Sequence, residues 1–167
     1  MTGEAVKEQV LDMGDVMRIL GLDYGEKRIG VAVSDELGLT AQGLETVLRK
    51  NTAHDMERIG KIARELGAEK IVVGYPLRLN GEEGIQCEKV KRFAARLETA
   101  LSIPVEFQDE TLTTKEAESI LIQANVRREK RKLLVDKLAA SIILQSYLDL
   151  NRVRGNSSEK ESGSGDA

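Results

Sequence analysis

The sequence of 167 residues has few of the features that stabilise or anchor specialised proteins. It contains one cysteine, Cys87, so no disulfide can form within the chain, as is usual in a reducing cytoplasm. No run of apolar residues is as long as a membrane span requires, and the first residues do not resemble a secretory signal. Tryptophan is absent and aromatic residues make up only 3% of the chain, so base stacking cannot dominate any recognition of nucleic acid. We therefore expect a soluble, cytoplasmic protein without a membrane partner.

Charge and composition divide the chain into three segments. Residues 1–16 hold one Lys and four acidic residues, a net charge of −3 that equals the formal net charge of the whole chain. Residues 151–167 are rich in Gly and Ser and have few apolar side chains to bury. We predict that 1–16 is a disordered extension, that 17–150 forms one domain, and that 151–167 is a disordered tail.

The spacing of apolar residues predicts an α/β fold. A capping box at Thr52 and Asp55 and a stop at Gly67 delimit one helix. In order along the chain, the predicted elements are strands at 18–23, 28–34 and about 41–48, a helix at 52–66, a strand at 70–74, a helix around 90–97, a strand at 104–108, and helices at 113–123 and about 132–150. A meander followed by alternating helices and strands predicts a mixed sheet of five strands flanked by helices.

Three acidic positions are unusual for their predicted surroundings. Asp23 lies inside a strand, where Asp is rare and where a buried carboxylate needs a compensating cation or donor. The pair Asp109–Glu110 ends another strand, and Asp136 interrupts an apolar helical run. Ala139 and Ala140 lie one turn beyond Asp136, and such small side chains would let that helix approach the sheet closely. These carboxylates can therefore converge.

Converging carboxylates without a nearby histidine favour Mg²⁺ or Mn²⁺, hard cations that are usually shared with substrate phosphates. Two such ions can promote hydrolysis of a phosphodiester without a protein nucleophile. The simpler interpretation is that Glu110 is solvated and that Asp136 pairs with Lys132 or Lys137. We favour the simpler interpretation for each of those residues alone, but not for Asp23.

A basic stretch precedes Asp136. From 127 to 137 the chain has six basic and two acidic residues, hence a local charge of +4. Clustered cations attract nucleic acid by neutralising its phosphates, although a short charged run is more often only a solvated loop. The basic residues that we assign to nucleic-acid binding here are Arg127, Arg128, Lys130, Arg131 and Lys132. In the turn at 74–84, Arg78 can contact a phosphate or face water.

The sequence closely resembles the RuvX/YqgF family, the Holliday-junction-resolvase-like proteins regarded as pre-16S rRNA nucleases. The resemblance covers most of 17–150 and is carried by four motifs in order. These are LDYGEKRIGVAVSD, GYPLRLNGEEG, DETLTTKEA and RREKRKLLVDKLAASIIL. It implies an RNase H-like fold and a divalent-metal site. It places Asp23, Glu110 and Asp136 in the catalytic role, with Asp109, Arg28 and Gly25 beside them. We assign Arg28 to nucleic-acid binding as well.

The chain departs from the family pattern at two positions. Thr111 stands where the family has Arg, and Tyr75 replaces the usual Leu. Loss of a guanidinium beside a catalytic carboxylate weakens the expectation of activity more than that of fold. Lys115 or Arg78 can compensate by contacting the phosphate.

Three functions are compatible with these residues. The preferred one is a metal-dependent endonuclease that acts on pre-rRNA or branched DNA, as a monomer or a homodimer. An Asp-x-Gly hairpin is also similar to that of actin and sugar-kinase ATPases, but those contain two such domains and this chain contains one. The third is a non-catalytic adaptor that binds RNA through a nuclease-like fold.

Overall fold

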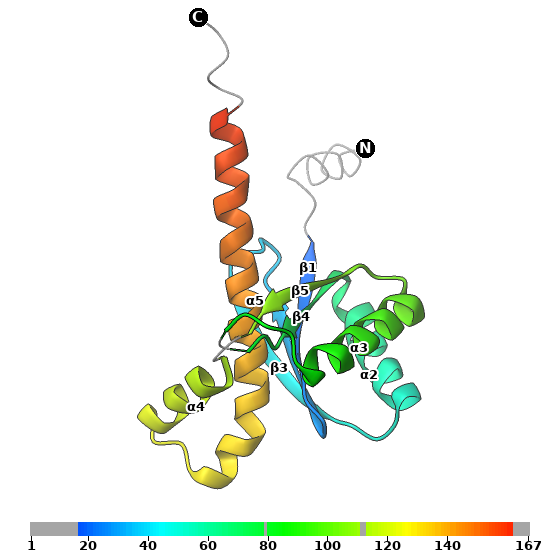
Figure 1. Cartoon of the computed structure of the whole chain (residues 1–167), viewed down its shortest axis with the longest axis vertical. Helices are drawn as coiled ribbons and strands as arrows, with labels where there is room; N and C mark the ends of the chain where they lie inside the picture. Colours follow the sequence, from blue (N-terminus) through cyan, green and yellow to red (C-terminus); the bar gives the residue numbers. More distant parts are fainter. Residues whose placement is uncertain (1–16, 79, 111–112, 162–167) are drawn as a thin grey trace, which may run out of the picture.

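A computed structural model describes residues 17–78, 80–110 and 113–161 of the chain (Figure 1). The strands are β1 Arg18–Tyr24, β2 Arg28–Ser34, β3 Ala41–Leu48, β4 Ala68–Tyr75 and β5 Val105–Asp109. The helices are α2 Thr52–Leu66, α3 Ile85–Leu101, α4 Thr113–Gln123 and α5 Arg128–Glu161. This order confirms the predicted succession of elements. None of the described helices is both long enough and apolar enough to span a membrane.

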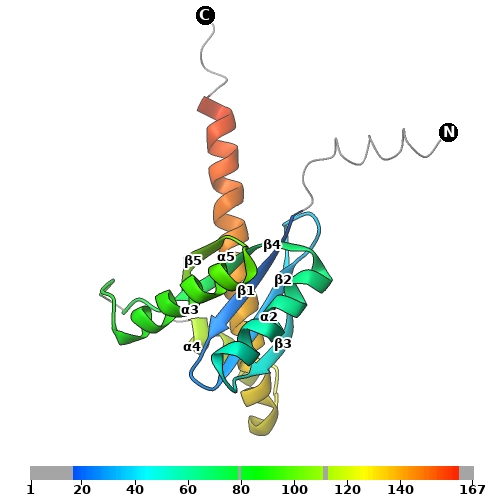
Figure 2. The same cartoon turned by 90° about the vertical axis from the view of Figure 1, so that its right-hand side faces the viewer.

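The five strands form one mixed sheet in the order β3-β2-β1-β4-β5. Strands β1 to β3 pair antiparallel as a meander, whereas β4 and β5 pair parallel, β4 with β1 and β5 with β4. Helices α2 and α3 cover one face, and α5 crosses the other with α4 beside it (Figures 1 and 2). The predicted five-stranded α/β sandwich is therefore confirmed.

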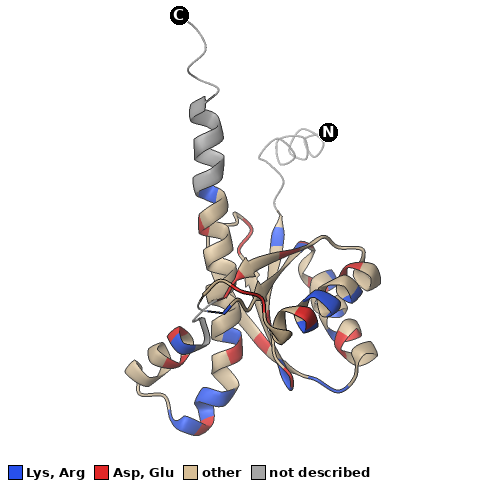
Figure 3. Cartoon of the chain, in the orientation of Figure 1, with Lys and Arg blue, Asp and Glu red and all other residues tan. Residues whose placement is uncertain are grey.

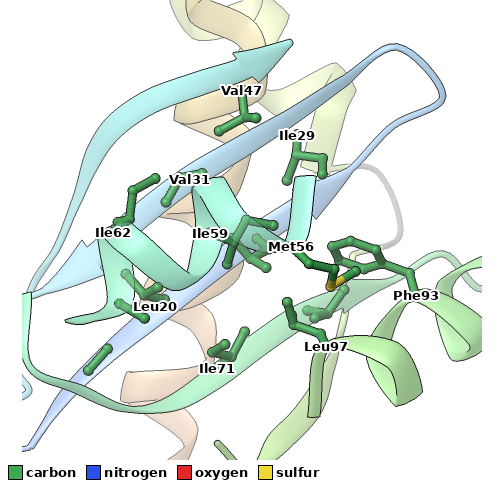
Figure 4. Packing of buried hydrophobic residues seen from close by; sticks show 14 of the residues in the cluster. Leu20, Ile29, Val31, Val47, Met56, Ile59, Ile62, Ile71, Phe93 and Leu97 are labelled. Carbon is green, nitrogen blue, oxygen red and sulfur yellow. The ribbon is translucent and has the colours of Figure 1, made fainter. Parts of the chain in front are cut away.

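The larger apolar core lies between the sheet and helices α2 and α3 (Figure 4). Alternate residues of each strand point to the same face, so Leu20 and Leu22 of β1 are fully buried here. Ile59 of α2 and Leu97 of α3 are also fully buried against them. At about 1.5–3 kcal/mol for each large apolar side chain removed from water, this cluster is the main source of stability.

The opposite face of the sheet is covered by α5, whose small residues permit a close approach. Ala139 and Ala140 are fully buried, as their spacing from Asp136 predicted. A Cβ atom on Gly21 of β1 would lie 2.7 Å from the Cβ of Leu144 in α5. Ile19, Gly21 and Asp23 are on this face, because they alternate with the apolar residues that point to the other one.

The predicted cap of α2 is wrong by one residue. Asn51 is the N-cap, and its side-chain oxygen accepts a hydrogen bond from the backbone nitrogen of His54 at 2.8 Å. Asp55, expected to complete a capping box with Thr52, is buried and accepts hydrogen bonds from the backbone nitrogen of Lys50 and from Nε of Arg49. The start of α2 is therefore stabilised by the Asn51 cap and by the ion pair between Arg49 and Asp55.

The C-terminal end of the fold also differs from the prediction. Residues 151–161, predicted to be part of a disordered tail, continue α5 as a helix that extends away from the sheet in both views (Figures 1 and 2). Once a helix is formed, each further residue adds a hydrogen bond without a new nucleation cost, so polar residues can prolong it. Residues 1–16 and 162–167, for which we predicted disorder, lie outside the described residues.

Candidate functional site

Asp23 lies at the carboxyl end of β1, on the face that α5 covers. Its partner in the antiparallel pair is Gly30 of β2. A Cβ atom on Gly30 would be 1.9 Å from the carbonyl oxygen of Asp136, a distance that no side chain could tolerate. Gly30 therefore lets the backbone of α5 touch the sheet at Asp136, beside Asp23.

Glu110 reaches the same place from β5. Its backbone nitrogen donates to the carbonyl oxygen of Tyr75 at 3.1 Å, which continues the parallel pairing one residue beyond the strand. Its carboxylate lies over Gly74 of β4, where an added Cβ would be 2.7 Å from Oε2. Because β4 separates β5 from β1, a small residue at 74 is what allows Glu110 to reach towards Asp23.

The carboxyl groups of Asp23 and Glu110 form a hydrogen-bonded pair. Burial, and to a smaller extent the negative charge of Asp136, raises the pKa of Asp23 to about 6. Burial, followed by the charge and the hydrogen bond of Asp23, raises the pKa of Glu110 to about 9. Near neutral pH Glu110 therefore keeps its proton and donates a hydrogen bond to the carboxylate of Asp23, as expected for two carboxyl groups that share one site.

Asp136 is close enough to raise the pKa of Asp23, but its carboxylate is paired with Arg28. Nε of Arg28 lies 2.7 Å from Oδ2 of Asp136, and the carboxylate is only 16% exposed. The interpretation that Asp136 pairs with Lys132 or Lys137 is wrong. Arg28 shares a strand face with Gly30, so the alternation of β2 was the sequence signal that could have identified this ion pair.

The structure therefore brings the three predicted catalytic residues close together but does not arrange them as one set of metal ligands. Within 17–78, 80–110 and 113–161, no group of three or more His, Cys, Asp and Glu residues is arranged to hold a metal ion. The pair Asp23 and Glu110 nevertheless fits Mg²⁺ or Mn²⁺, because these ions take oxygen ligands and often use only one or two carboxylates together with substrate phosphates. A divalent cation would replace the proton that the pair now shares.

A basic pocket of about 290 Å³ opens beside this site, between α4 and α5. Its cations are Arg28, Arg128, Arg131 and Lys132, and its other lining residues are Glu118, Ile122 and Val135. Figure 3 shows the concentration of Lys and Arg where α4 joins α5. Arg28 belongs both to this pocket and to the ion pair with Asp136, so the pocket and the carboxylates form one continuous site.

The remaining predicted nucleic-acid contacts lie outside that pocket. Arg127 and Lys130 are exposed at the start of α5, and Lys115 is exposed in the first turn of α4. Arg78 lies in the loop before α3, with its guanidinium 3.1 Å from the position that a Cβ on Gly84 would take. Thr111, one of the two departures from the family pattern, lies outside the described residues.

The chain is similar in sequence to one protein family and to individual proteins from other organisms. Residues 17–150 match the family model described as "RuvX: Holliday junction resolvase". A "Putative pre-16S rRNA nuclease" from Syntrophus aciditrophicus is 68% identical over 133 residues, which are 80% of this chain and 89% of that protein. A protein of the same name from Halothermothrix orenii is 49% identical and is covered over 100% of its length by 83% of this chain.

Solved structures with the same fold have little sequence in common with this chain. RuvC from T. thermophilus, solved in complex with a Holliday junction substrate, aligns over 81% of this chain and 96% of its own. The TM-score is 0.52 and the identity is 16%. The Fowlpox virus resolvase in complex with Holliday junction DNA aligns over 80% of this chain and 97% of its own, with a TM-score of 0.52 and an identity of 13%. These likenesses confirm the RNase H-like fold predicted from the motifs.

Proposed function

Because this chain belongs to the RuvX family, we propose that it is a metal-dependent endonuclease that hydrolyses phosphodiester bonds in structured nucleic acid. The observation that carries this proposal is the hydrogen-bonded pair Asp23 and Glu110, whose pKa values are both raised. Paired carboxyls that are destabilised in their ionised form are typical of sites that bind a cation or handle protons. Cytoplasmic location, predicted from the sequence, belongs to the same proposal.

In this mechanism Asp23 and Glu110 would hold Mg²⁺ or Mn²⁺, and Asp136 would complete the ligand set if Arg28 released it. Such an ion, when bound, lowers the pKa of a water nucleophile and stabilises the leaving oxygen. Before binding, the shared proton keeps the two carboxyls from repelling each other. Arg28 would exchange its contact with Asp136 for one with a substrate phosphate.

Substrate binding would use the basic pocket between α4 and α5. Arg128, Arg131 and Lys132, which line this pocket, would neutralise backbone phosphates next to the carboxylates. Arg127 and Lys130 would extend this surface along α5. Arg78 and Lys115 would contact the strand further from the scissile bond. Because these contacts are to phosphates, recognition would depend on the shape of the nucleic acid more than on its sequence.

The proposed substrate is the 5′ end of precursor 16S rRNA, because the similar proteins from S. aciditrophicus and H. orenii carry that name. Four-way DNA junctions are the alternative substrate, because T. thermophilus RuvC and the Fowlpox virus resolvase were solved with them. A resolvase would act on its two-fold symmetric substrate as a dimer, whereas trimming of an RNA end would not require one.

The proposal is tested by incubating the full chain with a pre-16S rRNA transcript and, separately, with a four-way DNA junction. Each substrate is offered with Mg²⁺, with Mn²⁺ and with EDTA. We expect metal-dependent cleavage, reduced by about 10²–10³-fold in Asp23→Asn and Glu110→Gln. Glu57→Gln, a matched change on the exposed side of α2, serves as the control. Equal cutting by all four proteins would contradict the assignment.

A non-catalytic RNA-binding adaptor is the second candidate. The ion pair between Arg28 and Asp136 favours it, because that pair occupies the third carboxylate that a two-ion site would use. An adaptor would bind the same RNA with strong dependence on salt, yet would not cut it with either metal. Cleavage by the wild-type chain that is lost in Asp23→Asn would exclude this candidate.

A further inference from the structure

A second basic pocket lies on the other face of the sheet, between α2 and α3. Its volume is about 140 Å³, equivalent to roughly four or five waters at about 30 Å³ each, which is room for a phosphate group. Four cations line it, Arg49, Lys89, Arg92 and Arg96, together with a single acid, Asp55. Neither the catalytic carboxylates nor the pocket between α4 and α5 shares any residue with it.

The fold fixes three of these cations on one side of α3. Lys89, Arg92 and Arg96 are spaced three and four residues apart, so they follow one another along the helix. Phe93 and Leu97, on the neighbouring side, are buried against the sheet (Figure 4). Because burial of these two residues prevents the helix from rotating, the basic row stays at the pocket.

Two of the four cations in the pocket already have partners. Arg49 is bound to Asp55 and to the carbonyl oxygens of Gly25 and Glu26, and Lys89 pairs with Glu26 at 3.0 Å.

By contrast, the single hydrogen bond that Arg96 makes within the described residues is donated to the hydroxyl of Thr52, at 3.4 Å. Arg92 makes no ion pair or hydrogen bond with any residue in the described part of the chain. Thr52 begins α2, whose amino end adds a partial positive charge to the same pocket. The pocket therefore combines an excess of positive charge with unused guanidinium donors.

The position of this pocket relates it to the catalytic site. Tyr24, one of its lining residues, directly follows Asp23 in β1. Successive residues of a strand point to opposite faces, so the two sites lie back to back at the same end of the sheet. The ring of Tyr24 is stacked on Phe93 at 4.4 Å between centroids and is covered by the guanidinium of Arg49 at 4.6 Å. Its ring is thus already engaged, which leaves charge as the means of recognition.

We propose that this pocket binds a backbone phosphate of the nucleic-acid substrate, at a point where the strand has passed around the end of the sheet from the catalytic carboxylates. Arg92 and Arg96 supply the contacts, since a guanidinium can donate two parallel hydrogen bonds to a phosphate. This inference rests on the proposed function, because it requires a polyanionic substrate. It adds a binding subsite on the face of the sheet that the proposed mechanism does not use.

The test measures binding rather than cleavage. A fluorescently labelled pre-16S rRNA fragment that includes the 5′ processing region is titrated with the full chain in EDTA, at several salt concentrations. We expect Arg92→Gln/Arg96→Gln to weaken binding by about 5–20-fold and to reduce the slope of log affinity against log salt by about 1–2. Lys61→Gln/Arg64→Gln removes two exposed charges from α2 outside the pocket, and we expect a change of less than about twofold.

A second arm distinguishes a backbone phosphate from a free small anion. Thermal unfolding of the wild type and of the arginine variant is followed with increasing pyrophosphate. If pyrophosphate stabilises only the wild type while both proteins bind RNA equally, the pocket holds a small anion and the proposal is overturned. Equal RNA affinity and equal salt slopes for the two double variants would overturn it as well.

These outcomes are separable from failure of the proposed function. If the wild type and both double variants bind and cut the RNA alike, only the subsite is disproved. If the wild type neither binds nor cuts any of the substrates, the nuclease assignment fails and the subsite fails with it.

Discussion

The two faces of the sheet have different compositions and different consequences. Between the sheet and α2 and α3 lies a cluster of large apolar side chains, such as Leu20, Ile59 and Leu97, that are fully buried. Between the sheet and α5 the apolar cluster is smaller, and the carboxylates and the glycines that admit them lie at one end of it. One face thus supplies most of the apolar burial, whereas the other holds the carboxylates of the candidate site. The carboxylates of the candidate site therefore do not interrupt the larger apolar cluster.

The largest effect on stability is expected on the apolar face. Ile59→Ala would remove a fully buried side chain from α2 and leave a cavity, at a cost of about 2–5 kcal/mol in the free energy of unfolding. Chemical denaturation measures that loss. Nuclease activity per folded molecule should be unchanged, because Ile59 faces away from Asp23. A proportional loss of activity in the folded fraction would show that the two faces are not independent.

A change on the opposite face should affect both properties. Gly30→Ala would put a Cβ 1.9 Å from the carbonyl oxygen of Asp136, so α5 would have to move away from the sheet. We expect destabilisation of about 1–3 kcal/mol together with loss of cleavage. Gly43→Ala is the matched control, since its nearest neighbour would be the carbonyl oxygen of Lys137 at 3.1 Å. If both variants behave alike in denaturation and cleavage, the close approach of α5 at Gly30 does not determine the geometry of the site.

Removing a buried charge should instead stabilise the metal-free protein. Glu110→Gln is expected to raise the free energy of unfolding by about 0.5–2 kcal/mol at pH 9 or above, because no second carboxylate then forms beside Asp23. In the wild type the folded-state pKa values of Asp23 and Glu110 are raised, to about 6 and about 9. Their contribution to the free energy of unfolding is therefore fully present below the ordinary carboxyl pKa of about 4. It is lost as pH rises through about 6 for Asp23 and then about 9 for Glu110.

Thermal unfolding in EDTA between pH 4 and pH 10 tests this expectation. The difference between the wild type and Glu110→Gln should grow with pH, whereas the difference between the wild type and Glu57→Gln should not. Addition of Mg²⁺ should stabilise the wild type more than Glu110→Gln. A difference that does not change with pH would contradict the shared proton.

The smallest effect is expected from the ion pair that joins α5 to β2. Arg28→Gln should cost up to about 1 kcal/mol, because Asp136 is largely covered in this pair. Arg18→Gln breaks the exposed pair with Glu36 and should cost about 0.5 kcal/mol or less. Denaturation of both variants at low and high salt gives the comparison. Equal costs would mean that the Asp136 pair is no more protected from solvent than a surface pair.

Much of the fold followed from local pattern. The alternation of Leu20 and Leu22 identified β1, and Gly67 adopts the left-handed conformation that ends α2. The cap itself was misplaced from Asn51 to Thr52, because both residue types favour that position and only the path of the backbone decides between them. The extent of α5 beyond 150 was also missed, since helix propagation does not depend on an apolar face.

For the site, the sequence identified the unusual carboxylates but not their partners. Asp23 was out of place in a strand, and Asp136 was out of place in an apolar helical run. The ion pair of Asp136 with Arg28 joins residues that are 108 positions apart, and nothing in local spacing determines such a contact. The basic pocket between α4 and α5 was predicted only as a charged stretch, because its other wall comes from α4.

The sequence by itself determined the order of strands and helices, the unusual position of Asp23 inside a strand and the presence of basic residues before Asp136. These properties depend on periodicity and composition, which act over a few neighbouring residues. Only the tertiary structure decided that Glu110 shares a proton with Asp23, that Arg28 binds Asp136, and that Arg92 and Arg96 border a pocket on the opposite face. Electrostatic interactions depend on distance and burial, and both are set by packing between elements that are remote in the chain.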